Sequence, residues 1–156
     1  MSVKVPPKGT RGVPFPRLPG WAATRLSRSM TRGFRKRGGG QTSGGLHAFL
    51  LETLGARSGE PRHAMLGYIE EGPESWLVIA SLGGAARHPA WLHNLARNPE
   101  ATIEFGDGRR VSVRAETLAG QELDEAWERI AAEAPEYPKY RSKTDRDIPV
   151  VRLRQV

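Results

Sequence analysis

The 156-residue sequence contains no cysteine, which excludes disulfide bonds, thiol nucleophiles and thiolate metal sites. No apolar run approaches the ~18 residues that a membrane-spanning helix needs. The N-terminal residues also lack an apolar stretch of signal-peptide length, which predicts a cytoplasmic protein. A chain of this length is expected to fold around one substantial core.

The usual signatures of metal and nucleotide chemistry are missing as well. There is no HExxH pair, no GxSxG nucleophile turn, no GxGxxG after a strand and no phosphate-loop GK[ST]. The histidines are not spaced like metal ligands, so no metal is expected; they are His47, His63, His88 and His93. These absences argue against zinc and serine hydrolases and against a dinucleotide-binding fold.

Acidic residues are absent from the first third of the chain. Residues 1–51 carry ten Lys or Arg and no Asp or Glu, whereas residues 52–156 carry fourteen basic and seventeen acidic side chains. The basic segment is therefore expected to meet an anionic partner. Five prolines and three glycines within residues 1–20 predict an extended or disordered arm. We expect residues 1–37 to form a basic, partly disordered arm and residues 38–156 to form the folded domain.

An amphipathic helix is predicted for residues 21–37, within this arm. Its apolar residues recur at every fourth position, and they are Ala22, Leu26, Met30 and Phe34. Three interpretations are open: the apolar stripe docks on the core, the helix lies on an anionic membrane surface, or it contacts nucleic acid. Trp21 suits a membrane interface, and no nucleic-acid module accompanies the helix, so nucleic acid is not expected. The membrane interpretation predicts a peripheral protein on the inner face of the cell membrane.

The remainder alternates between short apolar runs and turn signals, which predicts a mainly β domain. Six short strands are expected, over residues 46–53, 64–70, 75–81, 102–105, 110–117 and 148–153. Residues 64–70 and 75–81 are expected to pair as a hairpin across a glycine-proline turn. A short crossover helix begins at Pro89, and a longer amphipathic helix spans residues 121–134. Together these elements predict a small antiparallel barrel with helical additions.

Two glycine-marked turns carry the chemistry that remains, at residues 55–62 and 81–88. Both follow strands, and both offer arginine together with backbone N–H donors. That combination favours a phosphorylated or polycarboxylate small molecule over a metal or a peptide. Four aromatic residues are candidates for a planar wall, and they are Tyr68, Trp91, Tyr137 and Tyr140. The residues alone indicate an anionic ligand and go no further.

Three stretches resemble the deazaflavin-dependent nitroreductase family, whose actinobacterial-type members use coenzyme F420. They are LLETLGARSGEPRHAMLGYIEEG, WLVIASLGGAARHPAWLHNLARNPEATIEFG and YPKYRSKTDRDIPVVRL. The likeness runs from about residue 38 to the carboxyl end. It implies a split β-barrel, an 8-hydroxy-5-deazaflavin coenzyme, and hydride transfer from the reduced coenzyme to a quinone or nitro compound. No oligomeric state follows from it.

The same resemblance implies roles for particular residues. Arg57, Ser58 and Arg62 would hold the phosphate and acidic tail of the coenzyme. Further contacts would come from Ser81, Gly83, Gly84, Ala85, Arg87 and His88. Tyr68, Ser81, Tyr137 and Tyr140 would border the deazaflavin and the substrate, with Tyr137 or Tyr140 stabilising the oxygen that gains charge. Trp91, His93 and Asn94 would pack and support the helix.

Two positions depart from the family pattern. Family members often have lysine where this chain has Leu82, and Arg-Lys where it has Ala56-Arg57. Weaker coenzyme binding, or a different preferred tail length, is therefore expected. Two alternatives stay open beside the reductase: a non-catalytic F420 carrier, and an oxidoreductase of the same fold that binds flavin mononucleotide.

Overall fold

Seven antiparallel strands form one sheet with the order β2-β1-β5-β6-β7-β4-β3 in the computed structural model, which describes residues 2–42 and 44–156. The strands are β1 (Ala48–Leu54), β2 (Pro61–Gly67), β3 (Ile69–Glu70), β4 (Ser75–Ile79), β5 (Glu100–Glu104), β6 (Arg110–Thr117) and β7 (Val150–Gln155). The helices are α1 (Gly20–Arg37), α2 (Ala90–Arg97), α3 (Gly120–Glu133) and α4 (Glu136–Ser142), with a 3-10 turn η1 (Leu82–Gly84).

The period-two pattern of the strands gives the sheet two apolar faces. In β1, Phe49 and Leu51 point into the main core, while Ala48 and Leu50 belong to a separate cluster on the outer face. In the same way Val78 of β4 faces the main core. The sheet curls around this core, and α2 packs into it with its Trp91, Leu92 and Leu95 side chains. Mainly β architecture with helical additions is confirmed.

One expected strand is two strands in the structure. Residues 61–67 pair with β1 at one edge of the sheet, and only Ile69 and Glu70 pair with β4 at the other edge. The expected hairpin between residues 64–70 and 75–81 is therefore limited to its last two residues. The chain bends at Tyr68, whose N–H bonds to the His47 carbonyl. Because this bend carries the chain from one end of the sheet to the other, it curls the sheet into a half-barrel.

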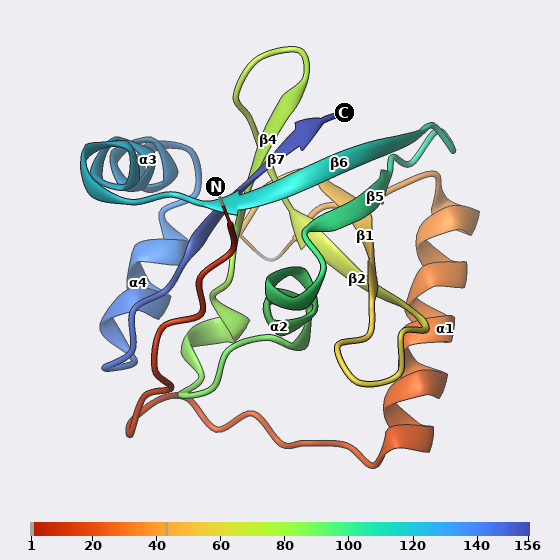
Figure 1. The fold of residues 1–156 in the computed structure, drawn as a ribbon, viewed down its shortest axis with the longest axis horizontal. Helices are drawn as coiled ribbons and strands as arrows, with labels where there is room; N and C mark the ends of the chain where they lie inside the picture. The colour runs from red at the N-terminus through yellow and green to blue at the C-terminus, as the bar shows by residue number, and fades with distance from the viewer. Residues whose placement is uncertain (1, 43) are drawn as a thin grey trace.

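Helices cover the outer faces of the half-barrel on opposite sides (Figure 1). On one side α3 and α4 pack on β4 and β7, where Trp127 and Ile130 meet Ile79 and Val150. On the other side α1 packs on β1 and β2 through Phe34, which is fully buried. No helix within residues 2–42 and 44–156 is long and apolar enough to cross a membrane.

The part of α1 from Ser27 onward contacts the sheet, where the Ser27 hydroxyl donates to the His63 carbonyl at 3.3 Å, and the part before it does not bury its large apolar side chains. Arg35 forms a bidentate pair with the buried Glu104 at 2.8 and 3.0 Å. The hydrogen bonds from Arg35 hold the pKa of the Glu104 carboxyl below its usual range. Trp21 and Leu26 nevertheless remain 69% and 61% exposed. The docking interpretation therefore holds for the C-terminal part of the helix only.

Residues 2–19 contain no helix or strand, and they run along the body of the protein (Figure 1). Ser2 begins beside β6, where its carbonyl accepts a hydrogen bond from the Thr117 N–H. Val3 is buried in the main core. The arm then crosses the η1–α2 connection before it reaches α1 (Figure 1).

Candidate functional site

A cavity of about 200 Å³ opens beside the first residues of η1. Its walls come from the ends of β2 and β4, the N-terminal end of α2, and α4. The residues that line it are Thr42, Met65, Leu66, Gly67, Ile79, Ser81, Leu82, Pro89, Trp91 and Tyr137. The cavity is smaller than the ~300–1,000 Å³ of a typical ligand site, so it suits one part of an elongated ligand.

The cavity has apolar walls and three hydroxyl groups, from Thr42, Ser81 and Tyr137. Burial raises the pKa of the Tyr137 hydroxyl, and the neighbouring Thr42 hydroxyl lowers it in part. Tyr137 is therefore a protonated hydrogen-bond donor at neutral pH. Within the part of the chain that the structure describes, the buried Thr42 oxygen makes no hydrogen bond of ordinary geometry.

The turn that begins at Ser81 has an unusual backbone. Ser81 is right-handed, with φ −80° and ψ −36°, and Leu82, Gly83 and Gly84 follow with φ of 41°, 63° and 87°. Leu82 is the one non-glycine residue with positive φ among the described residues, a conformation that costs about 1–2 kcal/mol. A right-handed residue followed by a left-handed one directs successive N–H groups into one concavity that suits an anion.

The hydrogen bonds of this turn leave two donors without a partner. The Gly84 and Ala85 N–H groups bond to the carbonyls of Ser81 and Leu82. Among the described residues, the N–H groups of Leu82 and Gly83 have no hydrogen-bond acceptor. Gly84 is required here because a Cβ atom would lie 2.9 Å from the Tyr140 carbonyl oxygen.

Arg146 lies behind this turn and holds it in place. Its guanidinium donates to the carbonyls of Ser81 and Ala85 at 2.7 Å each and to that of Ala80 at 3.1 Å. The residue is 5% exposed, and burial lowers its pKa. No carboxylate of the described residues forms an ion pair with it, so its positive charge remains available to attract an anion near the turn.

His88 and Arg87 are engaged by other parts of the chain. The Nε2 atom of His88 lies 2.8 Å from the Pro6 carbonyl, so it carries the proton. Its Nδ1 accepts from Arg146 at 3.2 Å. Burial, with the nearby Arg146 charge, lowers the His88 pKa, so the ring is neutral. Arg87 donates to the Phe15 carbonyl and lies over the Phe15 ring.

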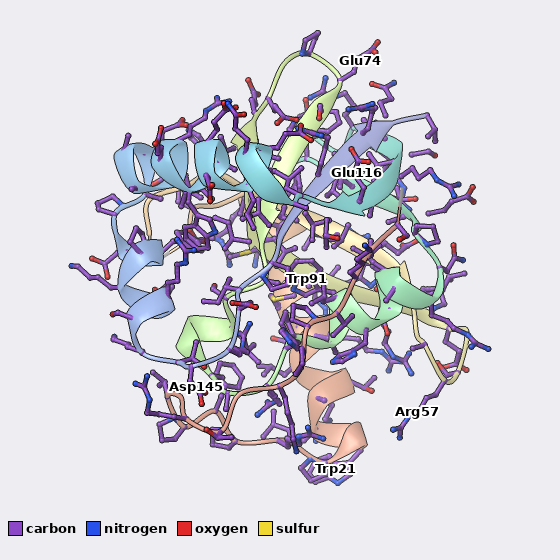
Figure 2. All side chains as sticks on the ribbon, turned by 60° about the vertical axis from the view of Figure 1, so that its left-hand side comes forward. Trp21, Arg57, Glu74, Trp91, Glu116 and Asp145 are labelled. Carbon is purple, nitrogen blue, oxygen red and sulfur yellow. The ribbon has the colours of Figure 1, made fainter. Side chains whose placement is uncertain are left out.

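The other glycine-marked turn, residues 55–62, is attached to α2 but does not line the cavity. Asn94 of α2 accepts a hydrogen bond from the Ala56 N–H at 2.9 Å and donates to Thr53 at 3.0 Å. Arg57 projects from the tip of the turn into solvent (Figure 2). Ser58 accepts from the Arg62 guanidinium at 3.3 Å. The supporting role expected for Asn94 is thus visible as two hydrogen bonds.

The structure separates the four expected pocket residues into two groups. Ser81 and Tyr137 meet at the cavity, whereas Tyr68 and Tyr140 are not among its lining residues. The Tyr68 ring stacks on Phe49 with centroids 4.6 Å apart, as part of the main core. Tyr140 packs edge-on against Tyr137 at 5.5 Å and so supports it from outside.

Several site residues were not anticipated from the sequence. Thr42 reaches the cavity from the segment before β1, and Met65 and Gly67 reach it from the end of β2, outside both glycine-marked turns. Trp91 was named both as a candidate for a planar wall and as packing for the helix, and it lines the cavity while it packs in the main core. Arg146 lies in the R-D-I-P-V-V segment that contributes to the family resemblance. The sequence of that segment does not by itself reveal that the arginine is a buried cation.

A model of the family described as F420H(2)-dependent quinone reductase matches residues 24–155. The chain belongs to this family. An F420H(2)-dependent quinone reductase of Mycobacterium tuberculosis is 37% identical over 132 residues, which are 83% of this chain and 87% of that protein. The expected use of coenzyme F420 is therefore confirmed, and the protein is an oxidoreductase that depends on reduced F420.

Solved structures of similar proteins agree with this assignment. An F420-H2 dependent reductase, FDR-A, matches with a TM-score of 0.61 at 34% identity, over 68% of this chain and 92% of its own. A protein described as a domain-swapped dimer matches with a TM-score of 0.63 at 32% identity, over 83% of this chain and 98% of its own. The half-barrel of this F420H(2)-dependent quinone reductase family member is thus the expected split β-barrel, with seven strands instead of six.

Proposed function

We propose that the cavity beside Ser81 receives the reacting part of the deazaflavin ring of F420 where it meets the quinone, and that the Ser81–Gly84 turn binds an anionic group of the coenzyme. The observation that carries this proposal is the pair of Leu82 and Gly83 N–H groups, which have no acceptor among the described residues, beside a cavity with apolar walls and hydroxyls. Arg146 adds positive charge behind the same turn. These groups fit a planar coenzyme that carries phosphate and carboxylates.

The Gly55–Arg62 turn supplies a second, exposed contact in this proposal. Arg57 and Arg62 meet the acidic tail of the coenzyme outside the cavity, with Ser58 oriented by Arg62. Because these arginines are solvent-exposed, each contributes modestly and in a salt-dependent way. Gly83 contributes its N–H, while Gly84 and Ala85 shape the turn. Arg87 and His88 act indirectly, since their side chains hold the arm and Arg146.

Bound reduced F420 supplies the hydride that quinone reduction requires. The protein contributes position, exclusion of water and a hydrogen bond to the quinone oxygen that gains charge. Tyr137 is the proposed donor because it lines the cavity and stays protonated, with the Ser81 hydroxyl beside the same space. Nitro compounds, which also gain charge on oxygen, are proposed as further acceptors.

The experiment that tests this function combines binding with turnover. Apo-protein is titrated with F420 and, in parallel, with flavin mononucleotide; the proposal expects saturable binding of F420 and weaker binding of the flavin. Reduced F420 bound to the protein is then mixed with menadione, and the absorbance of oxidised deazaflavin should return. Binding without turnover would indicate a carrier, and preference for flavin mononucleotide would indicate a flavin enzyme.

Replacing Tyr137 with phenylalanine should lower menadione turnover about 10-fold or more, because a hydrogen-bond donor to the developing oxyanion is lost. The F420 dissociation constant should change less than about twofold, since the ring that shapes the cavity remains. Tyr140→Phe, whose ring lies outside the lining, should have a smaller effect on turnover. Equal turnover in wild type and Tyr137→Phe would remove Tyr137 from this role.

We propose that the arm and the start of α1 rest on the anionic inner surface of the cell membrane, where quinones dissolve. Among the described residues, most of the large exposed apolar side chains fall between residues 13 and 26: Val13, Phe15, Leu18, Trp21 and Leu26. Basic residues lie among them, and the same segment has no acidic residue. Apolar side chains flanked by arginine are typical of a segment that lies in a lipid interface.

The double replacement Trp21→Ser/Leu26→Ser should reduce flotation with phosphatidylglycerol-containing vesicles about 10-fold, because two exposed anchors are lost. Wild-type flotation should also fall as salt rises, since the attraction is screened over ~8–10 Å at physiological ionic strength. Val156→Ser removes a side chain that is 73% exposed elsewhere and serves as the matched control. Flotation of the double variant equal to that of wild type would exclude the lipid surface as the partner.

A further inference from the structure

We propose that residues 6–15 of the N-terminal arm support coenzyme binding. They hold residues 81–88, which include the Ser81–Gly84 turn, in the conformation that binds the coenzyme. The inference rests on the proposed function, in which this turn binds F420. It extends that function to a segment that lies before the residues matched by the family model. The arm is thus a positioning element of this particular chain.

The arm bonds directly to the backbone of the turn. The Gly9 N–H donates to the Ala86 carbonyl at 2.8 Å, and the Val13 N–H donates to the Gly84 carbonyl at 2.9 Å. Pro6 receives the His88 ring N–H, as described above. These bonds are spread along the turn, so they restrain its conformation rather than a single point.

A second set of bonds fixes the arm to the segment that carries Arg146. The Asp145 carboxylate accepts from the N–H groups of Thr10 and Arg11 at 2.9 Å each, and from the Thr10 hydroxyl. The Thr144 hydroxyl donates to the Arg11 carbonyl at 2.8 Å. The hydrogen bonds from the Thr10 hydroxyl and from the N–H groups of Arg11 and Thr10 lower the Asp145 pKa to about 2, so the carboxylate stays charged at physiological pH. Figure 2 shows Asp145 beside the ribbon of the arm.

The turn is therefore held from two directions. Arg146 binds the carbonyls of Ser81 and Ala85, and the arm binds those of Gly84 and Ala86. With these carbonyls engaged, the N–H groups of Leu82 and Gly83 keep their common direction. Leu82 needs such support because its positive φ is strained, and strained backbone persists only where the surroundings determine it.

The arm lies outside the cavity and so does not compete for it. No residue of the arm is among the cavity-lining residues, and the N–H groups of Leu82 and Gly83 are not used by it. An arm that blocked the coenzyme would occupy these donors. The contacts therefore favour a supporting role over an inhibitory one.

Gly12 provides a sharp test because the arm approaches the turn most closely there. A Cβ atom on Gly12 would lie 2.3 Å from the Ala86 nitrogen and 2.7 Å from the Gly84 oxygen. Gly12→Ala must therefore lift the arm from the turn without altering the core. Gly40→Ala is the matched control, since a Cβ there meets nothing within 4 Å and its φ is not positive.

Three measurements on the full-length protein decide the matter: the F420 dissociation constant, the rate of tryptic cleavage within the arm, and amide hydrogen exchange of the turn without coenzyme. Gly12→Ala should weaken F420 binding at least fivefold, speed cleavage and speed exchange at residues 82–88. Gly40→Ala should match wild type. Asp145→Ala, which removes the carboxylate that holds Thr10 and Arg11, should act in the same direction as Gly12→Ala.

An arm that is cleaved faster while the affinity and the exchange of the turn stay at wild-type values would overturn the proposal. Tighter F420 binding on release of the arm would overturn it too, by showing that the arm competes. Unchanged cleavage, affinity and exchange in both Gly12→Ala and Asp145→Ala would show that the arm does not hold the turn. Failure of wild type to bind F420 would count against the proposed function alone, because exchange of the turn still reports on the arm.

Discussion

Replacing Arg152 with methionine should lower the free energy of unfolding by about 3 kcal/mol, because it leaves neighbouring carboxylates without their common cation. Arg152 forms a bidentate pair with Glu71 at 2.6 and 2.9 Å. It also binds Glu116 at 3.1 Å and Glu122 at 2.7 Å. One side chain thus joins β7 to β6, to the β3–β4 turn and to the first turn of α3. In a chain of this size such a loss corresponds to a fall in Tm of roughly 6–12 °C.

Arg154 is the matched control for this prediction. It lies two residues further along β7 and is 59% exposed, and its guanidinium is 3.8 Å from the same Glu116. An exposed pair of this kind contributes about 0–1 kcal/mol, so Arg154→Met should change Tm little. Adding Glu116→Gln to the Arg152→Met variant should recover part of the lost stability. Equal Tm values for Arg152→Met and Arg154→Met would show that the cluster does not stabilise the fold.

The same cluster makes stability depend on acid. Hydrogen bonds from Arg152 hold the pKa of Glu71 below its usual value, so the folded state favours the charged carboxylate. This contribution is present above the unfolded pKa of about 4.3 and is lost as pH falls through the lower folded value. In Arg152→Met the hydrogen bonds are gone, so thermal melts below pH 4 should show a smaller acid-dependent loss than wild type.

Local sequence patterns predict a strand well where its apolar and polar residues alternate, because one face of that strand is buried and the other is exposed. Residues 110–117 form β6, as the alternation of Val113 and Ala115 with polar neighbours predicts. The break at Tyr68 was not predictable in this way, because the apolar run continues through it. What divides the run is the partner of each half, β1 or β4, and pairing partners are set by the whole sheet.

The candidate site shows the same limit. Ser81 and Tyr137 were anticipated through the family resemblance, and both reach the cavity. Thr42 was not anticipated, because it lies in no recognisable motif and reaches the site only when the sheet curls. The path of the arm along the protein could not be predicted from the sequence, for a different reason. On its own side the arm makes its contacts mostly through backbone atoms, which leave no periodic pattern of side chains to detect.

Replacing Arg146 with methionine should weaken F420 binding about 10-fold or more, which corresponds to at least about 1.4 kcal/mol. The physical reason is that its guanidinium donates to four acceptors at once, and no other side chain of the turn donates to them. These acceptors are the carbonyls of Ala80, Ser81 and Ala85 and the ring of His88. Without it the Ala80 and Ala85 carbonyls and the His88 Nδ1 lose their guanidinium donor, at a cost of about 1–3 kcal/mol for a buried group left unsatisfied, while the Ser81 carbonyl keeps only its bond from the Gly84 N–H. The turn is then expected to rearrange, and the positive charge behind it is also lost.

Arg146→Lys separates charge from geometry. Lysine keeps a positive charge but offers a single ammonium, which cannot reach the same acceptors as a planar guanidinium. If the shape of the turn decides binding, lysine should restore less than half of the lost binding free energy; if charge alone decides it, lysine should restore nearly all. Arg141→Met, whose side chain lies over the Trp127 ring away from the cavity, is the control. Wild-type F420 affinity in Arg146→Met would mean that the Ser81–Gly84 turn does not bind the coenzyme.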